Sequence, residues 1–194
     1  MTTTTTEQVV LLDEDGRATG TMDKRAVHHR ETPLHLAFSC YVFDASGALL
    51  VTQRALHKPT FPGVWTNSCC GHPAPGEPLE NAVRRRVLQE LGVTLHDVRL
   101  LLPAFRYHAT AEDGTVENEM CPVYVATTAE PVRPDPEEVA GTAWEPWSEF
   151  RTGVLDRSRE VSLWCREQVA LLPADPLAAP AQPDGALPPA ARPS

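Results

Sequence analysis

Gly71-His-Pro-Ala-Pro-Gly-Glu-Pro-Leu-Glu-Asn-Ala-Val-Arg-Arg-Arg-Val-Leu-Gln-Glu-Leu-Gly-Val93 is the stretch that organises this chain. It opens as a loop rich in glycine and proline and continues into a helical pattern. Apolar residues recur at spacings of three and four, at Leu79, Ala82, Val83, Val87 and Leu91. This spacing predicts an amphipathic helix that begins near Pro78 and is stopped by Gly92. On that helix Arg86 and Glu90 share a face, and the ordinary alternative for the pair is a solvated salt bridge worth ~0.3–0.5 kcal/mol.

The same stretch resembles the Nudix box. Matching positions carry the glycine, first glutamate, arginine, last glutamate and closing glycine of that box, at Gly71, Glu77, Arg85, Glu90 and Gly92. However, Arg86 and Gln89 stand where the box has two further glutamates. A hydrolase of that superfamily uses these carboxylates to hold divalent metals and activate water. We therefore predict a Nudix loop and helix that serve another chemistry.

Length and charge exclude several classes of protein. The 194 residues, of which 42% are hydrophobic, suit one domain with a sizeable core. A formal net charge of -9 argues against a nucleic-acid-binding protein, which needs a basic face. We expect no membrane association, because the chain has neither a run of 18 apolar residues nor a signal-peptide pattern. Five cysteines without paired spacing predict reduced thiols and a cytoplasmic location.

Periodicity divides the chain into a central domain, 7–172, between a disordered N-terminal tail, 1–6, and a disordered, Pro/Ala-rich C-terminal tail, 173–194. Within the domain we expect strands at 8–13, 34–44, 49–54, 64–70, 98–110, 116–127 and 139–147, and helices at 22–29, 78–92 and 158–172. Segments 34–44 and 49–54 are predicted to form a hairpin, as are 98–110 and 116–127. The pattern predicts an α+β fold.

A group of histidines and carboxylates has the composition of a metal site. It comprises His28, His35, His72, Glu117 and Glu119, a mixed N/O set suited to a divalent ion. Glu117 and Glu119 would share one face of a strand, because side chains alternate along it. Each has an ordinary alternative, since lone histidines are usually surface residues or hydrogen-bonded core residues, and strand glutamates are usually solvated. We assign that ordinary role to His29, His57, His96 and His108.

Further motifs are similar to those of type I isopentenyl-diphosphate delta-isomerase, and the similarity runs from about Val9 to Leu172. They are Thr19-Gly-Thr-Met-Asp-Lys24, Leu34-His-Leu-Ala-Phe38, Arg54-Ala-Leu-His-Lys58, Trp65-Thr-Asn-Ser-Cys-Cys-Gly-His-Pro73, Phe105-Arg-Tyr107 and Glu117-Asn-Glu119. The resemblance implies an α/β/α Nudix-like fold with a mixed, largely antiparallel sheet flanked by helices. It also implies interconversion of isopentenyl and dimethylallyl diphosphate through a tertiary carbocation, in isoprenoid biosynthesis.

The resemblance also implies roles for individual residues. Cys70 and Glu119 would transfer protons, Tyr107 would hydrogen-bond the carboxylate, and Trp164 would face the hydrocarbon. The implied metal ligands are His28, His35, His72, Glu117 and Glu119, which would hold Mn²⁺, Mg²⁺ or Zn²⁺. Glu90, with the backbone carbonyl of Cys70 as a further candidate, would hold a Mg²⁺ that arrives with the substrate. The implied diphosphate anchors are Lys24, Arg54, Lys58 and Arg86.

Two other functions compete with this interpretation. A Nudix hydrolase would share the fold and a diphosphate site, but Arg86 and Gln89 argue against it. A non-enzymatic module that binds metal or nucleotide has no need for Cys70 and Glu119 together. For partners we expect a small diphosphate and, in solution, a monomer or weak homodimer.

Overall fold

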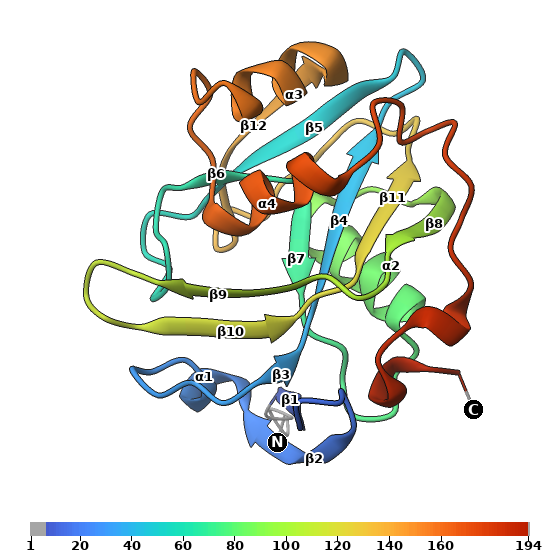
Figure 1. The fold of residues 1–194 in the computed structure, drawn as a ribbon. Coiled ribbons are helices and arrows are strands. Elements are labelled where there is room, and N and C mark those ends of the chain that lie inside the picture. The colour runs from blue at the N-terminus through green and yellow to red at the C-terminus, as the bar shows by residue number, and fades with distance from the viewer. Residues whose placement is uncertain (1–6, 194) are drawn as a thin grey trace, which may run out of the picture.

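The structure, a computed structural model, describes residues 7–193 as two β-sheets with helices on both sides (Figure 1). The N-terminal tail predicted at 1–6 lies outside the described residues. The first sheet has the order β2-β1-β3-β10-β9. Its strands are β1 (Gln8–Leu12), β2 (Ala18–Asp23), β3 (His35–Leu36), β9 (Arg106–Thr110) and β10 (Val116–Met120).

The second sheet has the order β12-β5-β4-β11-β8, with β6 paired to β5 and β7 paired to β4. Its strands are β4 (Phe38–Phe43), β5 (Ala48–Arg54), β6 (Trp65–Thr66), β7 (Cys69–Gly71), β8 (His96–Leu102), β11 (Val123–Thr127) and β12 (Val139–Pro146). The helices are α1 (Lys24–Val27), α2 (Leu79–Leu91), α3 (Trp147–Leu155) and α4 (Leu163–Leu171), with short 3₁₀ turns η1 (Asp184–Ala186) and η2 (Pro189–Ala191). Among the helices of residues 7–193, none is long and apolar enough to cross a membrane.

Three segments predicted as continuous strands each pass from one sheet to the other. Residues 34–44 form β3 and β4, residues 98–110 form β8 and β9, and residues 116–127 form β10 and β11. The last break falls at Pro122, which has no backbone N–H to donate to a ladder. The crossings run side by side, because β10 pairs with β3 and β9 in the first sheet, and β11 pairs with β4 and β8 in the second. This arrangement brings the ends of both sheets to one place.

The predicted hairpin of β4 and β5 is present but short. The two strands pair only at Val42–Leu50 and Phe43–Leu49. Beyond these pairs they separate, and β7 joins β4 while β6 joins β5. The separation makes room for β7, and its residue Cys70 lines a cavity.

Helix α2 has the bounds and the buried face that the sequence predicts. Leu79, Val83 and Val87 are buried, and Gly92 ends the helix in the left-handed conformation at φ 66°. A Cβ on Gly92 would approach the carbonyl oxygen of Arg133 to 2.9 Å, so a larger residue would be strained there. The end of β7 also lies close to the helix, since a Cβ on Gly71 would lie 3.0 Å from Arg86 Cγ.

Two apolar cores confirm the α/β/α layering (Figure 1). Alternate residues of β4 face opposite sides, as a strand requires. Phe38 and Val42 join the core beneath α2. Tyr41 and Phe43 join the core beneath α3 and α4.

The C-terminal region differs from the sequence prediction in its helices. The helix expected at 158–172 begins only at Leu163, because the Ser162 side chain accepts a hydrogen bond from the Cys165 amide and caps it. Helix α3 was not predicted. Its sequence contains Gly153 and has a short apolar face of Trp147, Phe150 and Val154.

The C-terminal tail also differs from the disorder expected at 173–194. The Arg99 side chain donates hydrogen bonds to the backbone oxygens of Leu177 and Ala179, at 2.7 and 2.9 Å. The Ala190 amide donates to the Gly16 oxygen at 2.9 Å. Leu187 is 3% exposed and belongs to the core beneath α2. Leu187, smaller apolar contacts and these hydrogen bonds thus hold a segment whose prolines lower its unfolded entropy.

Replacing Leu187 by alanine should lower the free energy of unfolding by about 2 kcal/mol or more, because a buried leucine leaves a cavity. Urea denaturation measures the difference. Leu171→Ala is the matched control, since Leu171 is 61% exposed and should change stability by less than about 0.5 kcal/mol. Equal effects of the two substitutions would contradict the docking of the tail.

Candidate active site

A cavity of about 660 Å³ collects nearly all the residues that the sequence predicts for the site. Those that line it are Lys24, His28, Arg54, Lys58, Cys70, His72, Arg86, Glu90, Tyr107, Glu117, Glu119 and Trp164. His35 is the exception, because it is fully buried behind Glu119. The walls come from both sheets, α2 and α4, so the crossing of the strands builds the site.

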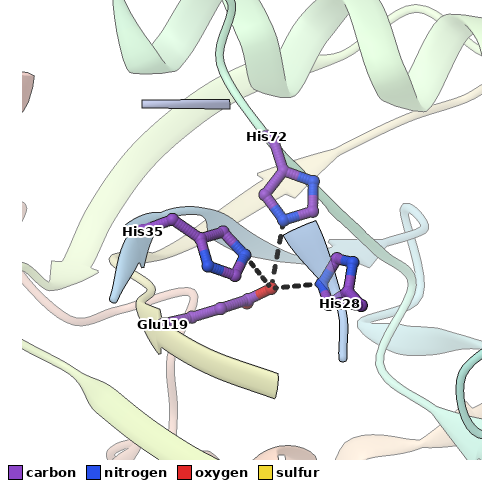
Figure 2. Close-up of side chains that lie close together, drawn as sticks. All are labelled: His28, His35, His72 and Glu119. Atoms are coloured by element: carbon purple, nitrogen blue, oxygen red, sulfur yellow. Dashed lines mark hydrogen bonds and ion pairs between the residues drawn. The ribbon is translucent and has the colours of Figure 1, made fainter. Parts of the chain in front are cut away.

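Three imidazoles surround one oxygen of Glu119 (Figure 2). Glu119 Oε1 lies 3.0 Å from His72 Nε2, 3.3 Å from His35 Nε2 and 3.9 Å from His28 Nε2. Parallel pairing of β3 and β10 sets His35 directly opposite Glu119. His72 follows β7, and His28 follows α1, so four separate segments meet here.

The donor set fits a divalent metal ion. Ligand atoms of His28, His35, His72 and Glu119 lie within 4.8 Å of one another. Among the described residues, Nε2 of His28 and Nε2 of His35 are buried without a hydrogen-bond partner. Buried polar atoms are normally satisfied, and neutral imidazoles with a carboxylate are common ligands. These four side chains can therefore hold a metal.

The second carboxylate, Glu117, lies beside this group rather than within it. Tyr107 Oη lies 2.8 Å from Glu117 Oε2 and 2.9 Å from Glu119 Oε2, so one hydroxyl links both carboxylates. Tyr107 faces Glu119 across the β9–β10 ladder. The hydrogen bond from tyrosine to carboxylate expected from the sequence is therefore present.

Burial and neighbouring groups push the pKa values of the site residues apart. Burial alone would raise the pKa of Glu119, but the three neighbouring imidazoles outweigh it and hold this pKa well below its usual range. Burial and the Glu119 charge raise the pKa of Glu117. Burial lowers the pKa of His72 to about 4, so its ring is neutral at neutral pH, as a metal ligand requires.

Cys70 and Trp164 contribute the less polar part of the cavity lining. Burial raises the pKa of the Cys70 thiol to about 12, despite hydrogen bonds with Ser39 and Asn67. The Trp164 ring is 1% exposed and lies 5.5 Å from the Tyr107 ring, centroid to centroid. Phe61, which the sequence did not single out, meets Trp164 edge-on at 5.3 Å. The indole is thus fixed by aromatic neighbours.

The predicted basic anchors line the same cavity, and three of them are paired with carboxylates. Lys24 binds Glu7 at 2.6 Å, Lys58 binds Glu138, and Arg86 binds Glu90 and, at 3.4 Å, Glu138. The pair of Arg86 and Glu90 is buried, so the ordinary alternative of a solvated salt bridge does not hold. The helix pattern could not show this, because Glu7 and Glu138 come from distant segments.

Arg54 is held differently. Its guanidinium donates to the backbone oxygens of Thr60 and Phe61, and its Cζ lies 5.8 Å from the Trp164 ring centroid. The histidines set aside from the sequence, His29, His57, His96 and His108, are all exposed, as expected.

Arg85 and Glu77 hold the loop of the box against α2. Arg85 donates to both Glu77 oxygens at 2.7 Å, and a weaker bond reaches the His72 carbonyl at 3.3 Å. Glu77 also accepts from the Ala74 amide at 2.8 Å. These two box residues therefore position the backbone that carries His72. Gln89, by contrast, is exposed.

Comparisons with known proteins identify the fold and the family. The model of the NUDIX domain matches residues 33–165. The DR0079 protein from Deinococcus radiodurans has a similar structure with a TM-score of 0.65 at 19% identity, over 85% of this chain and 98% of that one. A MutT NUDIX hydrolase from Burkholderia pseudomallei gives a TM-score of 0.55 at 19% identity, over 71% and 96%. These structures show the Nudix fold.

Relatives that are similar in sequence identify the family within the proteins of this fold. Proteins named isopentenyl-diphosphate Delta-isomerase are 58% identical over 166 residues in Saccharopolyspora erythraea, covering 86% of each chain, and 56% identical over 172 residues in Mycolicibacterium vanbaalenii, covering 89% of this chain and 94% of that one. The relative of that name from Rhizobium rhizogenes is 49% identical over 190 residues, or 96% and 91%. The chain therefore belongs to the isopentenyl-diphosphate Delta-isomerase family and carries its chemistry on a Nudix fold.

Proposed function

We propose that this protein interconverts isopentenyl diphosphate and dimethylallyl diphosphate by adding a proton at one end of the allylic system and removing one at the other. One observation carries the proposal: Cys70 and Glu119, from different sheets, line a single cavity that Trp164 also lines. Isomerisation of an unactivated alkene needs two such groups in one site. Relatives of the same name over most of the chain support it.

Glu119 is prepared for proton transfer by its surroundings. The three imidazoles crowd Oε1, and the Tyr107 hydroxyl contacts Oε2. We assign His28, His35, His72, Glu119 and Glu117 as the ligands of Mn²⁺, Mg²⁺ or Zn²⁺, with Glu117 reaching the ion from its place beside Tyr107. A bound ion would supply positive charge that keeps Glu119 ionised and oriented.

Cys70 is the second group that moves a proton. Protonation of the terminal alkene carbon produces a tertiary carbocation at the neighbouring carbon, and loss of a proton from C2 completes the shift. Cys70 Sγ and a Glu119 carboxylate oxygen are the atoms that give and accept these protons. The order depends on which substrate is bound.

The carbocation must be protected from water and stabilised without a nucleophile. The Trp164 ring does both, because its indole face attracts a cation by ~2 kcal/mol or more when desolvated. Tyr107 and Phe61 pack against this ring and hold it in place.

The diphosphate would bind at the basic end of the cavity. Lys24, Lys58 and Arg86 are already balanced by Glu7, Glu138 and Glu90, so these cations alone bring little net positive charge. We propose that Arg54 and a Mg²⁺ that arrives with the substrate supply the remaining positive charge that the diphosphate needs. Glu90, with the Cys70 carbonyl as a further candidate, would hold that ion.

The activity can be tested directly by supplying isopentenyl diphosphate with Mg²⁺ and following the products by proton NMR. We expect the two methyl signals of dimethylallyl diphosphate to appear. Release of inorganic phosphate without the isomer would instead indicate a Nudix hydrolase, and no turnover at all would favour a binding module.

Substitutions should separate metal binding from turnover. Cys70→Ala should keep the metal content of the wild type, measured by elemental analysis, while turnover falls by at least ~10²-fold through loss of a proton-transferring group. His72→Ala should lose most of the metal. Cys40→Ala, which removes a fully buried thiol from the core beneath α2, is the control and should keep both metal and turnover. Normal turnover in Cys70→Ala would contradict the assignment.

A further inference from the structure

A buried network of hydrogen bonds surrounds the Cys70 sulfur on the side away from the solvent. Cys70 Sγ lies 3.3 Å from Asn67 Oδ1 and 3.3 Å from Ser39 Oγ. Ser39 and Asn67 are fully buried, as is Gln168, which contacts Ser39 from α4. Asn67 belongs to the motif at 65–73, Ser39 and Gln168 were not singled out by the sequence, and the mechanism above uses none of the three.

The direction of the bond between Cys70 and Asn67 is fixed by the neighbours of Asn67. Its Nδ2 lies 3.0 Å from the Cys40 carbonyl and 2.9 Å from the Cys69 carbonyl. Both oxygens only accept, so Nδ2 must donate to them and Oδ1 must point to Cys70. An amide oxygen carries no hydrogen. The single S–H hydrogen of Cys70 therefore goes to Asn67.

The bond between Ser39 and Cys70 must then run from Ser39 to sulfur. A hydroxyl has one hydrogen to donate and two lone pairs. Gln168 Nε2 donates to Ser39 Oγ at 2.9 Å, while its Oε1 accepts from the Tyr41 hydroxyl at 2.9 Å. Cys121 Sγ, 3.4 Å away, can donate to the second lone pair of Ser39. The Ser39 hydrogen is left for Cys70.

On these contacts we infer that Ser39 is a positioning residue for the reaction, donating a hydrogen bond to Cys70 Sγ that orients the thiol and stabilises negative charge on sulfur. The inference rests on the proposed function, because it gives Cys70 a proton to move. When that proton is on the substrate carbon, the sulfur is a thiolate and the donated bond becomes charge-assisted. Ser39 thus acts through Cys70 and need not touch the substrate.

Ser39→Ala should lower kcat at least ~10-fold and leave KM within about twofold, because a donor to a developing charge is lost while the diphosphate contacts remain. Cys40→Ala is the matched control: Cys40 is the next residue of β4, its thiol is buried, and its side chain lies in the other core. It should leave kcat unchanged. Equal loss in both variants would overturn the inference.

Infrared spectroscopy of the S–H stretch gives a readout that packing alone would not move. The difference between wild type and Cys70→Ala isolates the Cys70 band. The difference between Ser39→Ala and the double variant Ser39→Ala/Cys70→Ala should show this band at higher wavenumber. The reason is that the Cys70 sulfur then no longer accepts a hydrogen bond from Ser39, which weakens the hydrogen bond that its S–H donates to Asn67. An unshifted Cys70 band would overturn the inference even if kcat fell.

A second pair of variants covers the case in which Ser39→Ala does not fold. Ser39→Thr and Ser39→Val introduce side chains of the same shape, and only threonine keeps the hydroxyl. We expect threonine to retain at least ~10-fold more kcat than valine; equal rates would contradict a role for the hydroxyl. The proposed function is tested separately by the turnover of Cys70→Ala. The role of Ser39 can therefore fail while the role of Cys70 stands, and the reverse.

Discussion

The buried carboxylate of Glu119 is the constraint on which the rest of this structure depends. Taking a charged carboxylate out of water is costly unless partners surround it. Here the partners are His28, His35, His72 and the Tyr107 hydroxyl, which come from four places in the chain. The strands that cross between the sheets bring these segments together. In the first sheet β10, which carries Glu119, lies between β3 and β9. The crossing of strands between the two sheets therefore determines both the fold and the position of the site residues.

The side of the cavity that carries Cys70 differs from the side that carries Glu119. Cys70 lies on β7, in the gap where β4 and β5 separate, and its sulfur is hydrogen-bonded to the uncharged side chains of Ser39 and Asn67. Neither of these side chains is a strong nucleophile that would capture the proposed carbocation. The same Nudix loop and helix that carry metal-binding carboxylates in a hydrolase here carry Arg86, held by Glu90 and Glu138. A shared fold thus supports a different reaction.

Much of the fold and site could be predicted from the sequence, because the signals are local. The spacing of apolar residues gave α2, and the motifs around His72, Tyr107 and Glu119 placed the site residues that the cavity brings together. The parts that could not be predicted depend on distant partners. Glu138 resembles any exposed acidic residue until Lys58 is found beside it. Leu187, isolated among prolines and alanines, gives no periodic pattern, yet it fills a place in the core.

Deuterium transfer with a Glu119→Gln variant tests the central claim most directly, because glutamine keeps the shape of the side chain and removes its ability to exchange a proton. Isopentenyl diphosphate is incubated in D₂O, and deuterated dimethylallyl diphosphate is measured by NMR, with circular dichroism to confirm folding. We predict that the folded variant forms the product at least ~10³-fold more slowly than the wild type. Near-normal formation of deuterated product would contradict the account.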